Sequence, residues 1–403
     1  MKRVLWLASW YPGRTAPFSG DFVKRHALAV SRLQSLSLIF ATKDEGISSG
    51  KISYEIQEGS ALKEHIAYYP CRQKIRLLQQ FSSLIYYFKA HLHLIKKISQ
   101  NNGLPEIVHV QIAMKAGLVA LYLKRRYGIP YVITENWTGY YPGNPDNLKG
   151  KNILYRFLVR LIFRNASVFL PVTEDLGKLV NRTITPIPFR VIPNVVDTRF
   201  FKPDIQGPVG VFGFVHISAL GYQKNPEGMI RSFKTLLKEG TPAKLTIVGP
   251  VSDQLCDFIS KSGLPDGSLL LTGEKKYEDV AEIIKKANAL VLFSRYENLP
   301  CVMLEALCCG LPVIATKVGG IAEVINNQNG LLIDSEDEQQ LLAAMKEMID
   351  NYSRYNRKAI SENAGRQFNY TSVGRQYLEV YHSVTGRPFP DTALPGNTAS
   401  GSE

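Results

Sequence analysis

Residues 297–325, ENLPCVMLEALCCGLPVIATKVGGIAEVI, decide the fold of this chain. The apolar run Ala289–Phe293 before them suits a buried strand, and a loop carrying Glu297 then leads into a short helix that begins near Pro300. Glycine and proline end that helix, and a second strand is expected at Leu311–Thr316. This order of strand, loop, helix and strand is typical of parallel α/β sheets that bind anions beside a helix N-terminus.

The same block offers groups for a ligand that carries both phosphate and hydroxyls. Backbone N–H groups between Leu299 and Val302, at the helix start that Pro300 marks, would face a phosphate. Glu305, eight residues after Glu297, is a candidate acceptor for ribose hydroxyls. Two glutamates at this spacing also occur by chance, so the pair alone indicates a site only weakly.

Strands and helices alternate along the chain, which predicts parallel sheets with helices on both faces. The strands expected in the first half are Val4–Ala8, Ser37–Ala41, Ile107–Gln111, Tyr131–Thr134, Ser167–Val172 and Arg190–Ile192. After a proline-rich linker at 193–208, they resume with Val209–Val215, Lys244–Val248, Leu269–Thr272, Ala289–Phe293, Leu311–Thr316 and Leu331–Ile333. We therefore expect two Rossmann-like α/β domains, 1–192 and 209–370, that face each other across a cleft. The tail 386–403 has little to bury and is expected to be disordered.

Composition and charge narrow the possible classes of protein. The apolar fraction of 45% is usual for a globular protein, and no apolar run approaches the ~18 residues of a transmembrane helix. The five cysteines are odd in number and scattered, which favours free thiols in a reducing compartment. Residues 1–190 hold 27 Lys and Arg against 11 Asp and Glu, so the excess positive charge lies in the first half. This asymmetry indicates a polyanionic partner or an anionic surface.

The block 297–325 resembles the donor-binding signature of the retaining glycosyltransferases of family 4. The resemblance rests on the Glu-x7-Glu spacing, the E-A-L-x-x-G-x-P-V-I-A-T run and the G-G-I-x-E-V-I turn. It extends more loosely over about residues 1–385 and implies the GT-B architecture, in which a last helix, here 371–384, crosses back to the first domain. That architecture puts the acceptor site in the first domain and the nucleotide-sugar in the second. The stretch GDFVKRH, which begins at Gly20, is similar to a family loop that faces the donor diphosphate.

The resemblance also implies roles for residues near the diphosphate. Lys224, four residues beyond Leu220, matches a family lysine that contacts this group. The family usually has an arginine before that leucine, whereas this chain has Ala219. Arg14 or Arg295 would have to substitute, or else Lys224 and backbone N–H groups suffice. The donor contacts implied in this chain are the loop Thr272–Tyr277 with Gly273 for the base, Glu305 for the ribose, Gly20, Lys224, Leu299 and Pro300 for the diphosphate, and Glu297 for the transferred sugar.

Asn136, in the stretch TENWTGYY, stands where the family often has a histidine beside the reacting sugar. An amide can hydrogen-bond a sugar hydroxyl, but it cannot relay a proton at neutral pH. His109, in the strand sequence IVHVQ, is the nearest alternative, although a lone histidine in a strand is more often a core residue. Trp137 and Tyr140 suit either stacking on a sugar or ordinary packing.

The segment Arg72–Lys97 has a helical apolar stripe with basic residues at both ends. The stripe consists of Leu77, Phe81, Leu84, Phe88, Leu92 and Ile95. Such a stripe predicts a helix that faces the core. A basic amphipathic helix also suits an anionic membrane surface, and the charge asymmetry supports that second interpretation.

Together, the residues and the resemblance predict a retaining glycosyltransferase that needs neither metal nor cofactor. It would move a sugar from a UDP-sugar, or less readily a GDP-sugar, to a glycan or polyprenyl-linked acceptor in cell-surface polysaccharide synthesis, such as lipopolysaccharide or capsule. We expect it in the cytoplasm, either free or peripheral on the inner face of the membrane. The alternative is a nucleotide-sugar epimerase of the same architecture, which would release no free nucleotide when an acceptor is added. No nucleic-acid-binding motif is recognised, and no G-x-G-x-x-G of a dehydrogenase follows a strand.

Overall fold

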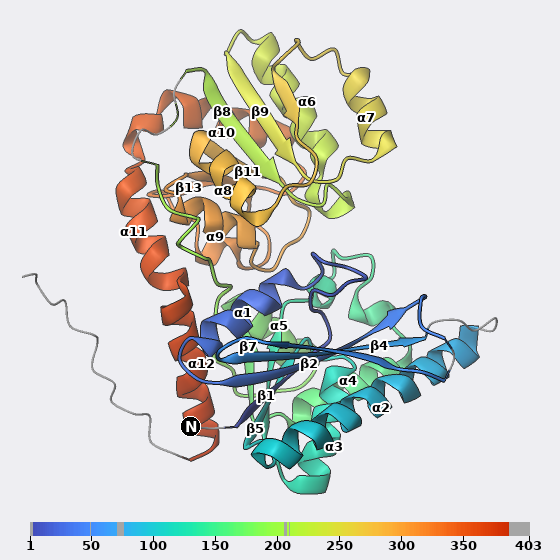
Figure 1. The fold of residues 1–403 in the computed structure, drawn as a ribbon. Helices are drawn as coiled ribbons and strands as arrows, with labels where there is room; N and C mark the ends of the chain where they lie inside the picture. Colours follow the sequence, from blue (N-terminus) through green and yellow to red (C-terminus); the bar gives the residue numbers. More distant parts are fainter. Residues whose placement is uncertain (1–2, 49, 71–75, 205–207, 209, 387–403) are drawn as a thin grey trace, which may run out of the picture.

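The structure is a computed structural model that describes residues 3–48, 50–70, 76–204, 208 and 210–386. The described chain forms two α/β units that face each other, one above the other in Figure 1. Each unit is built on a mainly parallel sheet, so the predicted fold class is confirmed.

The first unit contains a seven-stranded sheet in the order β3-β4-β2-β1-β5-β6-β7. Its strands are β1 Val4–Ala8, β2 Leu36–Asp44, β3 Ser53–Glu58, β4 Leu62–Pro70, β5 Ile107–Gln111, β6 Tyr131–Glu135 and β7 Val168–Pro171. The helices between them are α1 Asp21–Ser31, α2 Arg76–Asn102, α3 Ala116–Tyr127, α4 Ile153–Asn165 and α5 Glu174–Thr183. Side chains alternate between the faces of a strand, so Leu5 and Leu7 pack with α2, α3 and α4, while Val4 and Trp6 pack with α1.

The second unit contains a six-stranded parallel sheet in the order β10-β9-β8-β11-β12-β13. Its strands are β8 Phe212–Ile217, β9 Ala243–Val248, β10 Leu269–Leu271, β11 Ala289–Leu292, β12 Val313–Thr316 and β13 Gly330–Ile333. Its helices are α6 Pro226–Lys238, α7 Asp253–Ser260, α8 Tyr277–Lys286, α9 Cys301–Cys308, α10 Glu338–Asp350 and α11 Arg357–Phe368. The strand order reverses between β8 and β11, and in such sheets ligands bind at the carboxyl ends of the strands beside that reversal.

The last described helix, α12 Tyr370–Val384, returns to the first unit and packs on α1, as the red helix in Figure 1 shows. The two helices approach closely at Gly374, because a Cβ there would lie 2.4 Å from the carbonyl oxygen of Ala29. Further along α12, Tyr381 lies beneath the sheet and accepts a hydrogen bond from Trp6 Nε1 at 3.0 Å. The C-terminal helix is therefore part of the core of the first unit.

Three local predictions differ from the structure. Residues 190–192 form no strand; Arg190 and Ile192 only donate backbone hydrogen bonds to residues of β7. The sheet is not wholly parallel, because β3 runs antiparallel to β4. These two strands were not predicted at all. The predicted disordered tail lies outside the described residues from position 387 onward.

The predicted core-facing stripe of α2 is only partly correct. Ile95 is buried and Phe88 packs against the core. Phe81, Leu84 and Leu92, which were also assigned to the core, are exposed, Phe81 by 72%. The buried face instead includes Tyr87 and His91, whose rings lie 4.1 Å apart. His91 Nδ1 bonds the Tyr87 carbonyl oxygen at 2.9 Å, whereas its buried Nε2 has no hydrogen-bond partner among the described residues. The buried face is thus rotated relative to the predicted stripe and shares Ile95 with it, because a count of apolar residues leaves out a buried histidine.

The start of the predicted segment Arg72–Lys97 cannot be compared with the structure. Arg72 and Lys74 lie outside the described residues, and so does the side chain of Leu77.

Candidate functional site

Lys224 and Glu297 meet at the carboxyl end of the second sheet. Glu297 lies in the loop after β11, and Lys224 ends a short 3-10 helix, η3 Tyr222–Lys224, that follows β8. The Lys224 ammonium forms an ion pair with the Glu297 carboxylate. This buried carboxylate also accepts hydrogen bonds from Ser294 Oγ at 2.9 Å and from Gln223 Nε2 at 3.2 Å. Two residues that the sequence singled out separately are thus brought together.

Glu305, the second glutamate of the block, pairs with a residue of the other unit. It lies on α9, and its Oε1 accepts a hydrogen bond of 2.6 Å from Arg25 Nη1 on α1. Both side chains are buried, and the Arg25 guanidinium also lies 4.7 Å from the centre of the Tyr277 ring. Burial raises the pKa of the Glu305 carboxyl, and the Arg25 charge opposes part of that rise. Sequence reasoning missed Arg25, because no local pattern links α1 to α9.

The loop before α9 is held by the linker and by the first unit. Asn194 Nδ2 donates to the carbonyl oxygen of Leu299 at 2.7 Å, while Asn194 Oδ1 lies 3.1 Å from His26 Nε2. Pro300 is the N-cap of α9, one residue before the first helical position expected for it. The N–H groups at the start of α9 therefore lie where the α1 side of the first unit meets the second.

A second contact between the units joins α5 to the turn after β12. The Glu323 carboxylate accepts hydrogen bonds from the backbone N–H groups of Glu174 and Asp175 at 2.8 and 2.7 Å. These N–H groups open α5, where an anionic acceptor is favoured by the helix dipole. Nearby, Thr173 Oγ1 donates to Asn298 Oδ1 at 3.1 Å.

A cavity of about 200 Å³ lies between the units, close to the predicted base loop. It is lined by Phe18 from the first unit and by Ala219, Gly249, Pro250, Glu274 and Lys275, among others, from the second. Gly273, predicted beside the base, has φ +69°, a left-handed conformation that glycine adopts freely. Its carbonyl oxygen accepts from Gly249 N at 3.0 Å, which joins two loops at this cavity.

The arginine that the family carries at position 219 has no simple substitute. Arg14 forms ion pairs of 2.7 Å with both Asp44 and Glu55, inside the first unit. Arg295 pairs with Glu336 at 2.9 Å and also donates to Asn225 and to the Tyr222 carbonyl. Lys275, which sequence reasoning did not single out, lines the same cavity as Ala219.

Gly20 is the N-cap of α1 and adopts a left-handed conformation with φ +69°. A Cβ at this position would lie 2.5 Å from the backbone of Trp10 and Tyr11. The tight packing of its own loop therefore requires glycine here, whether or not a phosphate approaches it. Its predicted contact with the diphosphate remains a prediction.

A larger cavity, about 600 Å³, lies in the first unit at the carboxyl ends of its strands. Its lining includes Trp10, Lys115, Glu135, Trp137 and Tyr140. Buried Glu135 organises the floor, because its carboxylate accepts from the N–H groups of residues 113, 136 and 137 and from the Tyr140 hydroxyl, each at 2.9–3.0 Å. Burial raises the pKa of Glu135, and these hydrogen bonds oppose the rise.

Asn136 and His109 have different surroundings. The amide nitrogen of Asn136 is buried without a hydrogen-bond partner among the described residues, beside the floor that Glu135 organises. His109 is fully buried, with Nδ1 2.6 Å from Tyr381 Oη and Nε2 2.8 Å from Thr134 Oγ1. Burial lowers its pKa well below the usual value. This geometry places His109 in the core beneath α12 and contradicts the predicted direct role in catalysis.

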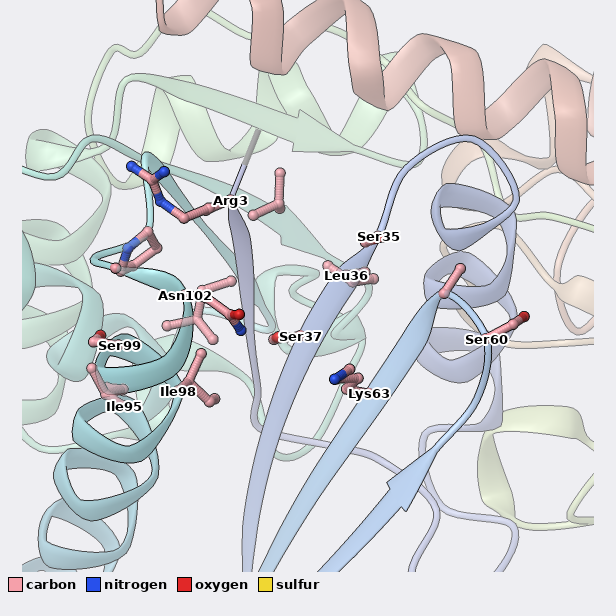
Figure 2. Close-up of a pocket in the computed structure, with 15 residues that line it drawn as sticks. Arg3, Ser35, Leu36, Ser37, Ser60, Lys63, Ile95, Ile98, Ser99 and Asn102 are labelled. Carbon is pink, nitrogen blue, oxygen red and sulfur yellow. The ribbon is translucent and has the colours of Figure 1, made fainter. Parts of the chain in front are cut away.

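A cavity of about 360 Å³ lies at the amino-terminal ends of strands of the first sheet, away from their carboxyl ends, and Figure 2 shows its lining. Arg3, Leu36 and Lys63 lie at the amino-terminal starts of their strands, and Asn102 ends α2. Because ligands of such sheets bind at the carboxyl ends, this cavity is not part of the candidate site.

Two further features are absent from the part of the chain that the structure describes. No group of three or more His, Cys, Asp and Glu side chains there is arranged to hold a metal ion. None of the helices described is both long and apolar enough to cross a membrane. Cys256, Cys301, Cys308 and Cys309 are free thiols.

Comparison with known families agrees with this arrangement. Residues 198–367 match the family described as Glycosyl transferases group 1, and residues 57–200 match Glycosyltransferase Family 4. The chain is a family 4 glycosyltransferase. In this glycosyltransferase the Lys224–Glu297 pair, Glu305 and Ala219 all fall within the first of the two matches.

Individual relatives cover most of the glycosyltransferase. It is 28% identical over 358 residues to an uncharacterized glycosyltransferase of Methanocaldococcus jannaschii, with 87% of this chain and 90% of the relative covered. It is 24% identical to the putative teichuronic acid biosynthesis glycosyltransferase TuaC of Bacillus subtilis, over 85% of this chain and 88% of TuaC. Among solved structures, sucrose-phosphate synthase from Thermosynechococcus elongatus aligns with a TM-score of 0.75 at 18% identity, covering 96% of this chain and 100% of that one.

Proposed function

We propose that this glycosyltransferase moves a sugar from a nucleotide-sugar to a glycan or lipid-linked glycan acceptor in cell-surface polysaccharide synthesis. A UDP-sugar is the preferred donor, and a GDP-sugar the second choice. The observation that carries the proposal is the Lys224–Glu297 pair at the carboxyl end of the second sheet, beside a cavity between the two units. A cation held next to a buried carboxylate in such a place suits a ligand with both phosphate and sugar hydroxyls.

Several relatives support the choice of donor and acceptor class. The Anabaena protein HepE, whose structures contain UDP, glucose and UDP-glucose, aligns with a TM-score of 0.68 at 16% identity over 95% of this chain and 100% of that one. TuaC is named for teichuronic acid, and WaaB, a lipopolysaccharide outer core galactosyltransferase, also shares the fold. Other relatives are glycogen and sucrose-phosphate synthases, so the relatives alone do not select an acceptor. The choice of acceptor class in this proposal rests on the excess of Lys and Arg in the first half of this chain.

The donor would lie between the units. Its base would meet the loop around Gly273 and Lys275, and its ribose would donate to Glu305. The diphosphate would lie between the Gly20 loop, the start of α9 and Lys224, with the transferred sugar on Glu297. Because negative charge builds on the departing diphosphate, a lysine oriented beside it stabilises the transition state more than the bound donor.

The transfer step follows from the same placement. The bond between the sugar and the diphosphate breaks, and the acceptor oxygen bonds the sugar carbon on the same face, so the anomeric configuration is retained. The acceptor proton passes to the departing phosphate oxygen. The Asn136 amide hydrogen-bonds sugar hydroxyls and takes no proton. Positive charge comes from Lys224 and the helix N-terminus, and in this proposal the reaction needs no metal ion and no cofactor.

Thermal unfolding with UDP, GDP and ADP tests the donor assignment. A nucleotide at about 100 times its dissociation constant adds about 2.7 kcal/mol to the free energy of unfolding. We expect UDP to stabilise most, and Glu305→Gln to lose most of that effect. Free nucleotide should then appear from the UDP-sugar when an acceptor glycan is added, whereas an epimerase would release none. Absence of stabilisation by all three nucleotides would overturn the proposal.

The place of action is proposed on the same grounds. We place the enzyme in the cytoplasm, peripheral to the inner face of the membrane, because its first half carries the excess of Lys and Arg. The acceptor would then be a glycan, free or attached to a polyprenyl carrier, and nucleic acid would not be a substrate.

A further inference from the structure

The outer faces of α2 and α4 expose large apolar side chains. On α4, Ile153, Leu154 and Phe157 are 78%, 63% and 58% exposed. On α2, Phe81, which belongs to the predicted core stripe, and Ile85, which does not, are also exposed. Large exposed apolar patches are unusual on soluble monomers and mark sites of interaction.

Both helices form walls of the same cavity. The cavity of about 600 Å³ in the first unit is lined by Leu84 and Tyr87 from α2 and by Tyr155 and Val159 from α4. Leu84 lines the cavity and is also exposed, next to Ile85 in the chain. Exposed apolar side chains thus lie on both helices that wall this cavity, and Leu84 reaches it directly, while Ile153 and Phe157 line a separate hollow.

Basic side chains accompany the apolar ones. Residues 81–102 and 146–165 together contain eight Lys and Arg and a single carboxylate, Asp146. Lys149, Arg156 and Arg160 line a hollow of about 500 Å³ on α4 together with Ile153 and Phe157. Long basic side chains around an apolar patch are suited to contact lipid phosphates while the apolar groups enter the acyl boundary.

We propose that this α2–α4 face docks the enzyme on an anionic lipid bilayer, with Ile153, Leu154 and Phe157 inserted at the interface. The cavity between the helices then opens at the membrane, and its substrate is a lipid-linked glycan. This choice of substrate rests on the proposed function, whereas the docking does not. A soluble anionic partner would need the charge but would leave the apolar side chains in water, so the bilayer accounts for both.

Flotation with vesicles tests the docking. The probe is a vesicle of equal parts phosphatidylglycerol and phosphatidylcholine, compared with phosphatidylcholine alone, at low salt. The full chain should float with the anionic vesicles, and high salt should weaken this binding because exposed charges are screened. Ile153→Ser, Leu154→Ser and Phe157→Ser together should reduce binding by more than about tenfold. All three side chains are exposed, so the fold should tolerate the change.

Two further variants complete the design. Val211→Ser with Leu270→Ser changes apolar residues of the second unit that are 49% and 58% exposed, and should leave flotation unchanged. Lys149→Gln with Arg156→Gln should weaken binding roughly fivefold per charge removed. Stabilisation by UDP, measured on the same proteins, should be equal in all of them.

The outcomes separate the two proposals. No flotation of the wild-type chain at low salt, or equal flotation of the triple α4 variant, would overturn the docking. A wild-type dimer in light scattering that the α4 variant abolishes would assign the face to a second copy and would also overturn it. If vesicles bind but UDP does not stabilise the protein, the donor assignment fails and the docking stands.

Discussion

Arg25→Ala removes the cation that holds Glu305, and we expect nucleotide binding to become dependent on pH. In the wild-type protein, Arg25 donates to Glu305 at 2.6 Å, and both side chains are buried. The pKa of Glu305 is already raised by burial, and Arg25 is the charge that opposes the rise. Without it, the pKa of the carboxyl should rise further, so that the carboxyl takes up a proton at a higher pH than in the wild-type protein.

The energies are large enough for this effect. Leaving one member of a buried ion pair without its partner costs about 3–5 kcal/mol. A tenfold change in protonation needs only about 1.4 kcal/mol. A charged acceptor contributes about 1.5–3 kcal/mol to a hydrogen bond, more than a neutral one. Protonation of Glu305 should therefore weaken UDP binding by roughly tenfold, with affinity recovered as the pH rises and the carboxylate returns.

Titration calorimetry with UDP, from about pH 6 to about pH 9, measures this directly. Arg25→Ala/Glu305→Gln is the matched control and should show weak binding that does not change with pH. Arg25→Lys keeps the charge and should restore part of the affinity. A UDP affinity of Arg25→Ala that equals the wild-type value across the whole range would refute the role given to this pair.

Three further perturbations test other parts of the structure. Lys224→Ala should lower kcat by about 100- to 1,000-fold, while donor affinity changes less, because the lysine acts on charge that develops at the diphosphate; unchanged turnover would remove it from the mechanism. The wild-type pH–rate profile should lack an imidazole inflection, whereas Asn136→His should introduce one near about pH 6.5 if this residue faces the acceptor hydroxyl. Burial lowers the pKa of His26, His91 and His216 to about 4 in the folded protein, below the usual value of about 6.5. The free energy of unfolding should thus be highest above about pH 6.5 and fall by about 1.4 kcal/mol per pH unit for each of these histidines as the pH drops toward 4. An equal free energy of unfolding in urea at about pH 7 and at about pH 5 would contradict this.

The sequence predicted correctly those elements whose pattern lies within a few neighbouring residues. The strands β1 and β5 have the predicted bounds, because each is a short apolar run with turn residues beside it. Lys224 and Glu297 were both identified through motifs, and their loops follow adjacent parallel strands, which brings them together.

The features that the sequence did not predict depend on contacts between residues that are far apart in the chain. The strands β3 and β4 form the edge of a sheet and carry charged residues among the apolar ones, which weakens their pattern. Arg25 and Glu305 are separated by 280 positions and meet only because the units face each other. His109 looked available for chemistry because nothing near it in the chain shows that α12 covers it.

The packing of α12 on α1 has a consequence for how the protein is made. The second unit folds from a continuous stretch of chain, but the core of the first is completed only by Tyr377 and Tyr381, near the end. Chains are synthesised from the N-terminus, and N-terminal domains generally fold first. Here the chain has to be synthesised as far as Tyr381 before Trp6 can form its hydrogen bond with that residue. We therefore expect the core of the first unit to stay incomplete in the nascent chain until α12 has been synthesised, after the second unit.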